Sequence, residues 1–176
     1  MRVTKDMIHP ELQTMAKIGK LMNASPSPKS MARSAKMIKR MMKGRCWSKN
    51  LNYEQIYLER SGKPQLRLCV YSPKVQQEKV PGLLWLHGGG YGKGVPEQDE
   101  GFIKRFVAAS GCVVVAPDYR TSIEEPYPAA LEDCYATYEL ITYMFKNYDV
   151  KHLIDSKFEY GYITNNKGYK GFIYKK

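Results

Sequence analysis

Two kinds of segment are missing from this 176-residue sequence. No run approaches the ~18 consecutive apolar residues of a membrane-spanning helix. The polar residues Asp6, His9 and Glu11 stand where a secretory signal peptide needs its apolar centre. We therefore expect a cytoplasmic protein without a transmembrane segment. A chain of this length suits one domain with a sizeable core.

Clusters of metal-binding residues are missing as well. The 4 cysteines form no Cys-x-x-Cys pair and the 3 histidines are scattered, so the ligand spacing of a zinc site is absent. Cys69 and Cys112 lie within apolar runs, where a free thiol behaves as a small hydrophobic side chain. The sequence therefore predicts reduced cysteines and no metal.

Acidic residues are scarce near the N-terminus. Residues 1–50 hold 12 Lys/Arg against 2 Asp/Glu, a net charge of +10, whereas residues 51–150 carry −3 and residues 151–176 carry +4. A basic amphipathic segment can bind an anionic membrane surface or a nucleic acid, but lysines more commonly solvate the outward face of a helix. Because no aromatic stacking platform is interleaved with these charges, we favour solvation and expect no nucleic-acid partner.

The N-terminal apolar spacing predicts two helices. One amphipathic helix is expected over residues 4–22, and Pro26 and Pro28 separate it from a Met-rich helix over residues 29–43. Gly44 is a plausible stop for the second helix. We expect ordinary packing on the side of this helix that carries Met31, Ala35, Ile38, Met41 and Met42.

From residue 51 the pattern changes to that of an α/β sheet. Strands are expected at 53–59 and 66–71 around the turn Ser61–Pro64, and then at 82–87 and 112–116. Helices are expected at 98–110 and 128–147. We place the following residues of the last helix along one packing side: Leu131, Cys134, Tyr135, Tyr138, Ile141 and Phe145.

The strand expected at 82–87 runs directly into His87-Gly88-Gly89-Gly90. Glycines allow a sharp turn there, and without Cβ atoms they let backbone N–H groups approach a ligand closely. In open α/β sheets, ligands bind at the carboxyl ends of the strands. The sequence therefore predicts a ligand site at these glycines.

Three motifs together resemble the hormone-sensitive-lipase-like branch of the α/β-hydrolase esterases and lipases. They are the His-Gly-Gly-Gly run, the strand and turn that end in Asp118-Tyr119-Arg120, and the helix start at Tyr127-Pro128-Ala129-Ala130-Leu131. The resemblance covers about residues 50–147. It implies the N-terminal part of an α/β-hydrolase fold, with a mostly parallel sheet, flanking helices and an N-terminal helical cap segment.

The same resemblance implies roles for individual residues. The amides of Gly88 and Gly89 would be the oxyanion-hole donors, with Gly90 a weaker third candidate. The other motif residues would be structural: His87, Gly90, Asp118, Tyr119 and Arg120, the last of which could pair with Asp133. The implied substrate is a small acyl ester, hydrolysed with side chains alone and no cofactor.

The sequence contains no Gly-x-Ser-x-Gly, the turn that holds the nucleophilic serine in this family. Ser122, Asp133 and His152 follow the family's triad order but lack that turn, so we treat their order as chance. We therefore expect a fold that is incomplete at the C-terminus: a truncated carboxylic-ester hydrolase with no identified catalytic serine, acid or base, inactive alone.

Two alternatives remain open for the function. The chain could be a non-catalytic protein that keeps the pocket for a small ligand, or a basic protein that contacts nucleic acid or a membrane surface through residues 1–50. The expected segments are a cap at 1–50, a partial hydrolase core at 51–149 and an atypical tail at 150–176.

The tail is rich in Tyr, Lys, Asn and Gly. We favour a shifted or interrupted reading frame there over a genuine hairpin around Asn165–Gly168. The same interpretation leaves the strand of Leu83–Leu86 at an open sheet edge. Because an open apolar edge is a template for aggregation, we expect the isolated chain to be poorly soluble.

Overall fold

A computed structural model describes residues 4–22, 27–75, 80–147, 161–164 and 170–175. No helix in these described ranges is both long and apolar enough to cross a membrane. In chain order the elements are the 3-10 helices η1 (Lys5–Met7) and η2 (Pro10–Leu12), α1 (Gln13–Met22), α2 (Pro28–Met42), β1 (Leu51–Arg60), β2 (Lys63–Pro73), β3 (Gly82–Leu84), the 3-10 helix η3 (Pro96–Asp99), α3 (Glu100–Ser110), β4 (Val113–Pro117), α4 (Ala129–Asn147), β5 (Gly161–Thr164) and β6 (Lys170–Lys175).

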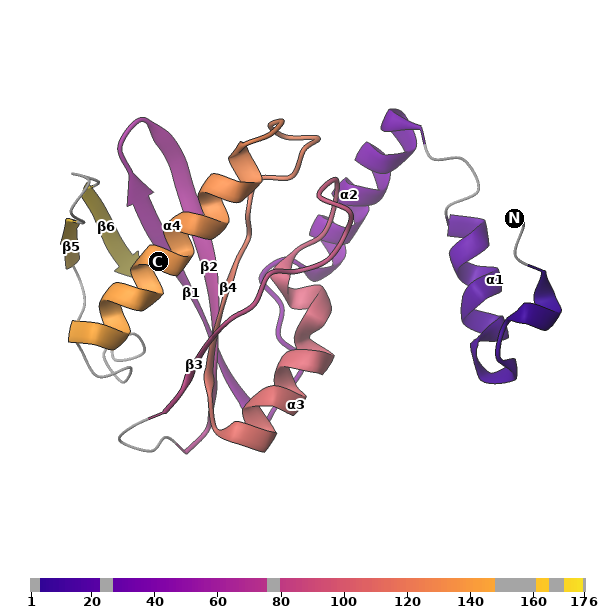
Figure 1. Ribbon diagram of the computed structural model, residues 1–176, viewed down its shortest axis with the longest axis horizontal. Helices are drawn as coiled ribbons and strands as arrows, with labels where there is room; N and C mark the ends of the chain where they lie inside the picture. The colour runs from indigo at the N-terminus through magenta and orange to yellow at the C-terminus, as the bar shows by residue number, and fades with distance from the viewer. Residues whose placement is uncertain (1–3, 23–26, 76–79, 148–160, 165–169, 176) are drawn as a thin grey trace.

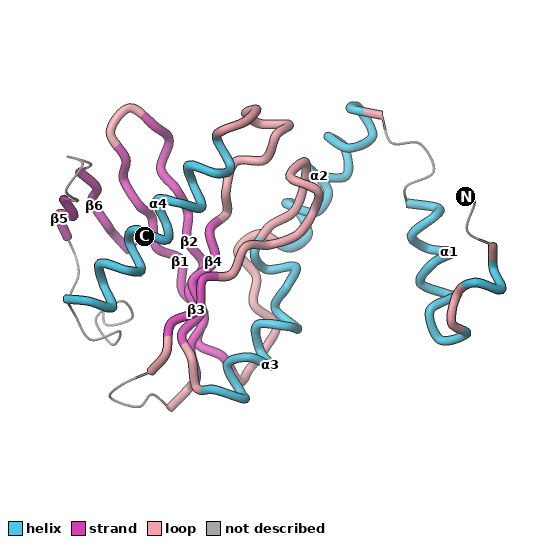
Figure 2. The backbone as a smooth tube through the Cα atoms, in the orientation of Figure 1, coloured by secondary structure: helices cyan, strands magenta, loops and turns pink. Residues whose placement is uncertain are grey.

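The strands form one sheet in the order β3-β4-β2-β1-β6-β5 (Figures 1 and 2). Among the described strands only β3 and β4 pair in parallel, and the other neighbours are antiparallel. The α/β fold class is confirmed, but the described sheet is mixed rather than mostly parallel. The reason is local: β1 and β2 form a hairpin through the two-residue turn at Ser61–Gly62, where Gly62 has a φ of 69°.

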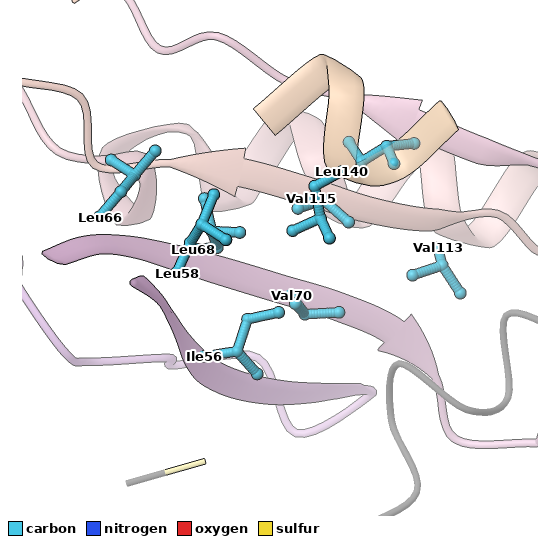
Figure 3. Packing of buried hydrophobic residues seen from close by; sticks show 9 residues of the cluster. Ile56, Leu58, Leu66, Leu68, Val70, Val113, Val115 and Leu140 are labelled. Carbon is cyan, nitrogen blue, oxygen red and sulfur yellow. The ribbon is translucent and has the colours of Figure 1, made fainter. Parts of the chain in front are cut away.

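Side chains alternate between the two faces of the sheet and build one core on each. Along β2, Leu68 and Val70 face one side while Cys69 and Tyr71 face the other. The first face is covered by α4, whose Leu140 lies over Val115 (Figure 3). The second face is covered by α3 through Ile103 and Val107. The buried thiols of Cys69 and Cys112 are free, as predicted.

Two predicted elements are shorter in the structure. The helix expected over 4–22 begins only at Gln13, because Pro10 falls in a separate 3-10 turn. The strand expected at 82–87 ends at Leu84, so His87 lies on a loop rather than on a strand. β3 is nevertheless the last strand at its end of the described sheet, as expected. The poor solubility that we expect because this sheet edge is open remains a prediction.

The packing side predicted for α4 was only partly right: Ile141 is buried and Cys134 is half-buried, and the side chain of Phe145 lies outside the described residues. Leu131, Tyr135 and Tyr138 are about half exposed, whereas Asp133 and Thr137 are fully buried. Both polar residues are satisfied there, because Asp133 binds two arginines and the Thr137 hydroxyl donates to the Asp133 carbonyl. A hydrophobic pattern cannot reveal a packed face that uses partnered polar residues.

The C-terminal tail forms the hairpin that we considered the less favoured alternative. β5 and β6 pair antiparallel, and β6 adds to the free edge of β1 at Ile56–Leu58. The turn residues Asn165–Gly168 lie outside the described residues. The pairing of these two strands does not test the expected shift of the reading frame, which stays a prediction.

Helix α2 packs beside the glycine loop, whereas α1 lies apart from the sheet (Figure 1). The Ser27 hydroxyl caps α2 by accepting from the Ser30 amide, and Gly44 follows the helix with a φ of 78°. On the predicted packing side, Met31, Ala35, Ile38 and Met42 are buried or half-buried. Met41 is 57% exposed and does not belong to that side.

Candidate functional site

A cavity of about 320 Å³ opens where β3 ends and α4 begins. Its walls are mainly apolar, and the glycine loop forms part of them. Such a concave site with few polar groups is the usual form of a small-molecule site. The residues that line it are Leu86, His87, Gly88, Gly89, Gly90, Tyr91, Tyr119, Ala130, Leu131 and Cys134.

The loop requires glycine at two positions, where the backbone lies very close to other atoms of the same loop. Gly89 has a φ of +134°, and a Cβ atom there would overlap the carbonyl oxygen of Lys93. Gly94 has a φ of +123°, and its Cβ would come within 2.7 Å of His87 Nδ1. The chain therefore folds back on itself with backbone against backbone, which only residues without a side chain permit.

His87 is held as a neutral, buried ring. It is 3% exposed, and it stacks on the Tyr119 ring with centroids 4.1 Å apart. Its Nδ1 lies 3.0 Å from the Gly88 carbonyl oxygen, which can only accept, so Nδ1 carries the proton. Burial lowers the pKa of His87 and favours this neutral form.

Hydrogen bonds to the carbonyl groups of His87 and Gly88 fix the orientation of the two candidate donor amides. The Tyr119 hydroxyl donates to the His87 carbonyl at 2.6 Å, and the Gln98 amide donates to the Gly88 carbonyl at 2.9 Å. In a planar trans peptide the next N–H points the opposite way. The N–H groups of Gly88 and Gly89 are therefore turned away from these partners, and they donate to no acceptor within the described residues.

Gly90 belongs to the same arrangement. The Gly89 carbonyl accepts from the Gly92 amide at 3.3 Å, which orients the Gly90 N–H in turn. Gln98 and the hydroxyl of Tyr119 are functional groups that the sequence reasoning did not assign. Gln98 lies ten residues after Gly88 in η3, and no sequence pattern marks it as a partner of that carbonyl.

Asp118 lies beneath the loop in a buried cluster of charges. The Arg67 guanidinium contacts Asp118 Oδ2 at 3.0 Å and Glu97 Oε1 at 2.6 Å, and Lys43 Nζ reaches Asp118 at 2.7 Å. Burial alone would raise the pKa of Glu97, but hydrogen bonds from Arg67 and from the Gly44 amide hold it below its ordinary value. The cluster ties β2, η3, β4 and the end of α2 together.

Arg120 pairs with Asp133, as the sequence suggested. Its Nη2 lies 2.7 Å from Asp133 Oδ1, and its backbone amide donates to Oδ2 at 2.8 Å. The structure adds Arg60 from β1 as a second cation on the same carboxylate. Burial would raise the pKa of Asp133, but these hydrogen bonds outweigh it and hold the pKa below its ordinary value.

Acid should therefore destabilise the fold through Glu97 and Asp133. Their folded pKa values are depressed, so the unfolded chain takes up protons first as the pH falls. The stabilisation is complete above about pH 5 and is lost progressively below it, with a slope of up to about 1.4 kcal/mol per pH unit for each carboxyl. Urea midpoints measured from pH 7 to pH 3 test this, and Asp133→Asn should flatten the slope.

The chance triad gains no support from the structure. Asp133 is fully engaged by Arg60 and Arg120, and His152 lies outside the described residues. Cys134 is the one thiol on the cavity wall among the described residues. Burial raises the pKa of Cys134 to about 11, which keeps it protonated near neutral pH. No group of three or more potential metal ligands occurs in the described part of the chain.

Comparisons with known proteins show a likeness to α/β hydrolases. A family model for the alpha/beta hydrolase fold matches residues 83–154. The chain is 38% identical over 60 residues to the esterase LipI of Mycobacterium tuberculosis, which is 34% of this chain and 19% of that protein.

Solved structures extend the match. A hyperthermophilic esterase from the archaeon Pyrobaculum calidifontis aligns with a TM-score of 0.56 and 26% identity, over 81% of this chain and 45% of that one. An esterase from the bacterial hormone-sensitive lipase family aligns with a TM-score of 0.57 and 25% identity, over the same shares. The chain thus spans less than half the length of these esterases. It carries part of the α/β-hydrolase fold.

Proposed function

We propose that residues 82–147 provide the oxyanion-stabilising part of a carboxylic-ester hydrolase that acts on small acyl esters. The observation that carries the proposal is the pair of unpartnered amides at Gly88 and Gly89, oriented by fixed carbonyls on the wall of an apolar cavity. The esterase names of the relatives support the same reaction class.

In this proposal the two amides stabilise the tetrahedral oxyanion of ester hydrolysis. Donors fixed before the reaction need no reorganisation as the charge develops, and each contributes about 10²–10³ in rate. The apolar side chains of Leu86 and Leu131 would contact the acyl chain. The 176 residues contain no Gly-x-Ser-x-Gly, so the proposal assigns no nucleophilic serine to them.

Binding of a short alkylphosphonate tests the oxyanion hole without a nucleophile. Its tetrahedral oxygens mimic the oxyanion, so we expect it to bind more tightly than the amide of the same chain length. In NMR spectra of the full chain, the Gly88 and Gly89 amide signals should shift on titration while Gly62 and Gly101 stay unchanged. Equal affinity for the two compounds, or no shift at the two glycines, would overturn the proposal.

Matched tyrosine variants sharpen the test. Tyr119→Phe removes the donor to the His87 carbonyl and should weaken phosphonate binding roughly two- to tenfold, the worth of one such hydrogen bond. Tyr138→Phe removes a hydroxyl from the exposed side of α4 and should change nothing. The full chain should also show no serine-dependent ester turnover, and labelling by a fluorophosphonate would contradict that expectation.

A non-catalytic ligand-binding protein is the second candidate. The observation in its favour is a mainly apolar cavity in a sequence that contains no Gly-x-Ser-x-Gly. It predicts saturable binding of a short-chain ester with no preference for the phosphonate. The same titrations therefore separate the two functions.

A further inference from the structure

Helix α2 has one face on the protein and an opposite face that is open. Met31, Ala35, Ile38 and Met42 recur at helical spacing on the packed face. Ion pairs of Lys39 with Glu124 and of Lys43 with Asp118 anchor the same helix. The side chains on the other side of the helix are exposed: Arg33, Lys36, Met37, Arg40 and Met41.

The cations of this open face have no acidic partners. Arg33, Lys36 and Arg40 make no ion pair within the described residues. The sequence offers none nearby either, because no Asp or Glu occurs between Glu11 and Glu54 while ten Lys/Arg do. A rigidly docked helix thus presents a concentrated positive charge to the outside.

Large apolar side chains lie among those cations. Met37 is 48% exposed and Met41 is 57% exposed on the same face. Trp47 follows the helix, and its indole is 56% exposed although its backbone amide is fixed by Glu100 at 2.9 Å. Charged side chains keep the surface of a helix in contact with water, but exposed Met and Trp side chains do not. Solvation of the helix therefore does not account for the apolar part of this surface.

We propose that this surface docks the protein onto an anionic phospholipid bilayer. We call the open face of α2 the basic face, and it consists of Arg33, Lys36, Met37, Arg40 and Met41, with the exposed Trp47 following it in the chain. Cations attract the negative headgroups, while Met and Trp side chains enter the boundary between headgroups and acyl chains. Trp is the residue best suited to that boundary, because one end of its ring is apolar and the other is polar.

A second amphipathic helix is available for the same role. Leu12 of η2 and Met15 and Ile18 of α1 are all about half exposed or more, and Lys17 lies among them in sequence. A nucleic acid would use the cations but would gain nothing from exposed methionines, so the apolar residues favour lipid. The proposal does not depend on the proposed esterase function.

Vesicle binding of the full chain tests the proposal. The chain should cosediment with vesicles of phosphatidylcholine and phosphatidylserine and should not cosediment with phosphatidylcholine alone. Binding should weaken as salt rises. Trp47 fluorescence should shift to shorter wavelength, and Trp47→Phe should abolish that shift, because the Trp85 indole already donates to Asp99 and stacks on Phe102.

Two sets of variants separate the contribution of the cations to vesicle binding from that of the methionines. Each cation near an anionic surface contributes roughly fivefold to partitioning, so Arg33→Gln/Lys36→Gln/Arg40→Gln should weaken binding on the order of 100-fold. The matched control Lys74→Gln/Lys104→Gln/Arg105→Gln removes the same charge from other exposed sites and should have a far smaller effect. Met37→Gln/Met41→Gln should also weaken vesicle binding.

Three outcomes would overturn the proposal. Equal binding to both kinds of vesicle would exclude charge recognition. An equal loss of vesicle binding in the two triple variants would mean that binding depends only on the net charge of the protein. Tighter binding to single-stranded or duplex nucleic acid that is unaffected by Met37→Gln/Met41→Gln would assign the basic face to nucleic acid instead.

Discussion

Replacing Gly89 with alanine is expected to destabilise the chain by about 3 kcal/mol or more and to abolish phosphonate binding. The residue adopts a φ of +134°, which an L side chain rarely adopts, and its Cβ would overlap the Lys93 carbonyl oxygen. Backbone strain of this kind costs about 1–3 kcal/mol, and the overlap forces the loop to move as well. The midpoint of urea unfolding and the phosphonate titration measure the two effects.

Gly101→Ala is the matched control for this change. Gly101 lies in α3, where a new Cβ meets no atom within 4 Å, and alanine is a better helix former than glycine by about 1 kcal/mol. This variant should be as stable as the parent or slightly more so, with unchanged phosphonate binding. A Gly89→Ala protein with the parent's midpoint would show that the loop does not require glycine there.

The second large effect is expected at Arg67. Arg67→Met leaves the Glu97 carboxylate, which is 1% exposed, without its main cation. Breaking a buried ion pair from one side costs about 3–5 kcal/mol, because an uncompensated charge remains buried. The urea midpoint should fall accordingly, and the loss should shrink in Arg67→Met/Glu97→Gln, where the buried charge is removed too.

An exposed ion pair supplies the comparison. Lys63 and Glu132 also pair, but their side chains are 34% and 41% exposed, and such pairs contribute little to stability. Lys63→Met should therefore cost a small fraction of what Arg67→Met costs. Similar losses of stability in Arg67→Met and Lys63→Met would mean that the ion pair of Arg67 with Glu97 contributes no more than an exposed ion pair.

The sequence predicted the parts of the fold that repeat a simple period. The strands at β1, β2 and β4 and the helices α2, α3 and α4 lie within a few residues of their expected ranges, because alternation and helical spacing report burial directly. The Gly-rich loop was also predictable, because His87–Gly90 combine a strand end with residues that permit close approach.

The missed features depend on contacts between distant residues. Asp133 is buried only because Arg60 and Arg120 converge on it, so its place on the packed side of α4 has no local signature. The same holds for Gln98 and the Tyr119 hydroxyl, which meet the loop carbonyls through the tertiary fold. The pairing of β6 with β1 is likewise a long-range contact without a sequence pattern.

The anchoring of α2 holds this helix in place beside the glycine loop. This helix cannot swing away as a lid without separating Lys43 from Asp118 and the Gly44 amide from Glu97, and its Met31 methyl group already fills the space beside Gly92. Leu86, Tyr91 and Leu131 on the cavity wall are each half exposed or more. The exposed part of the cavity wall therefore comes from the glycine loop and α4, while α2 stays fixed beside that loop.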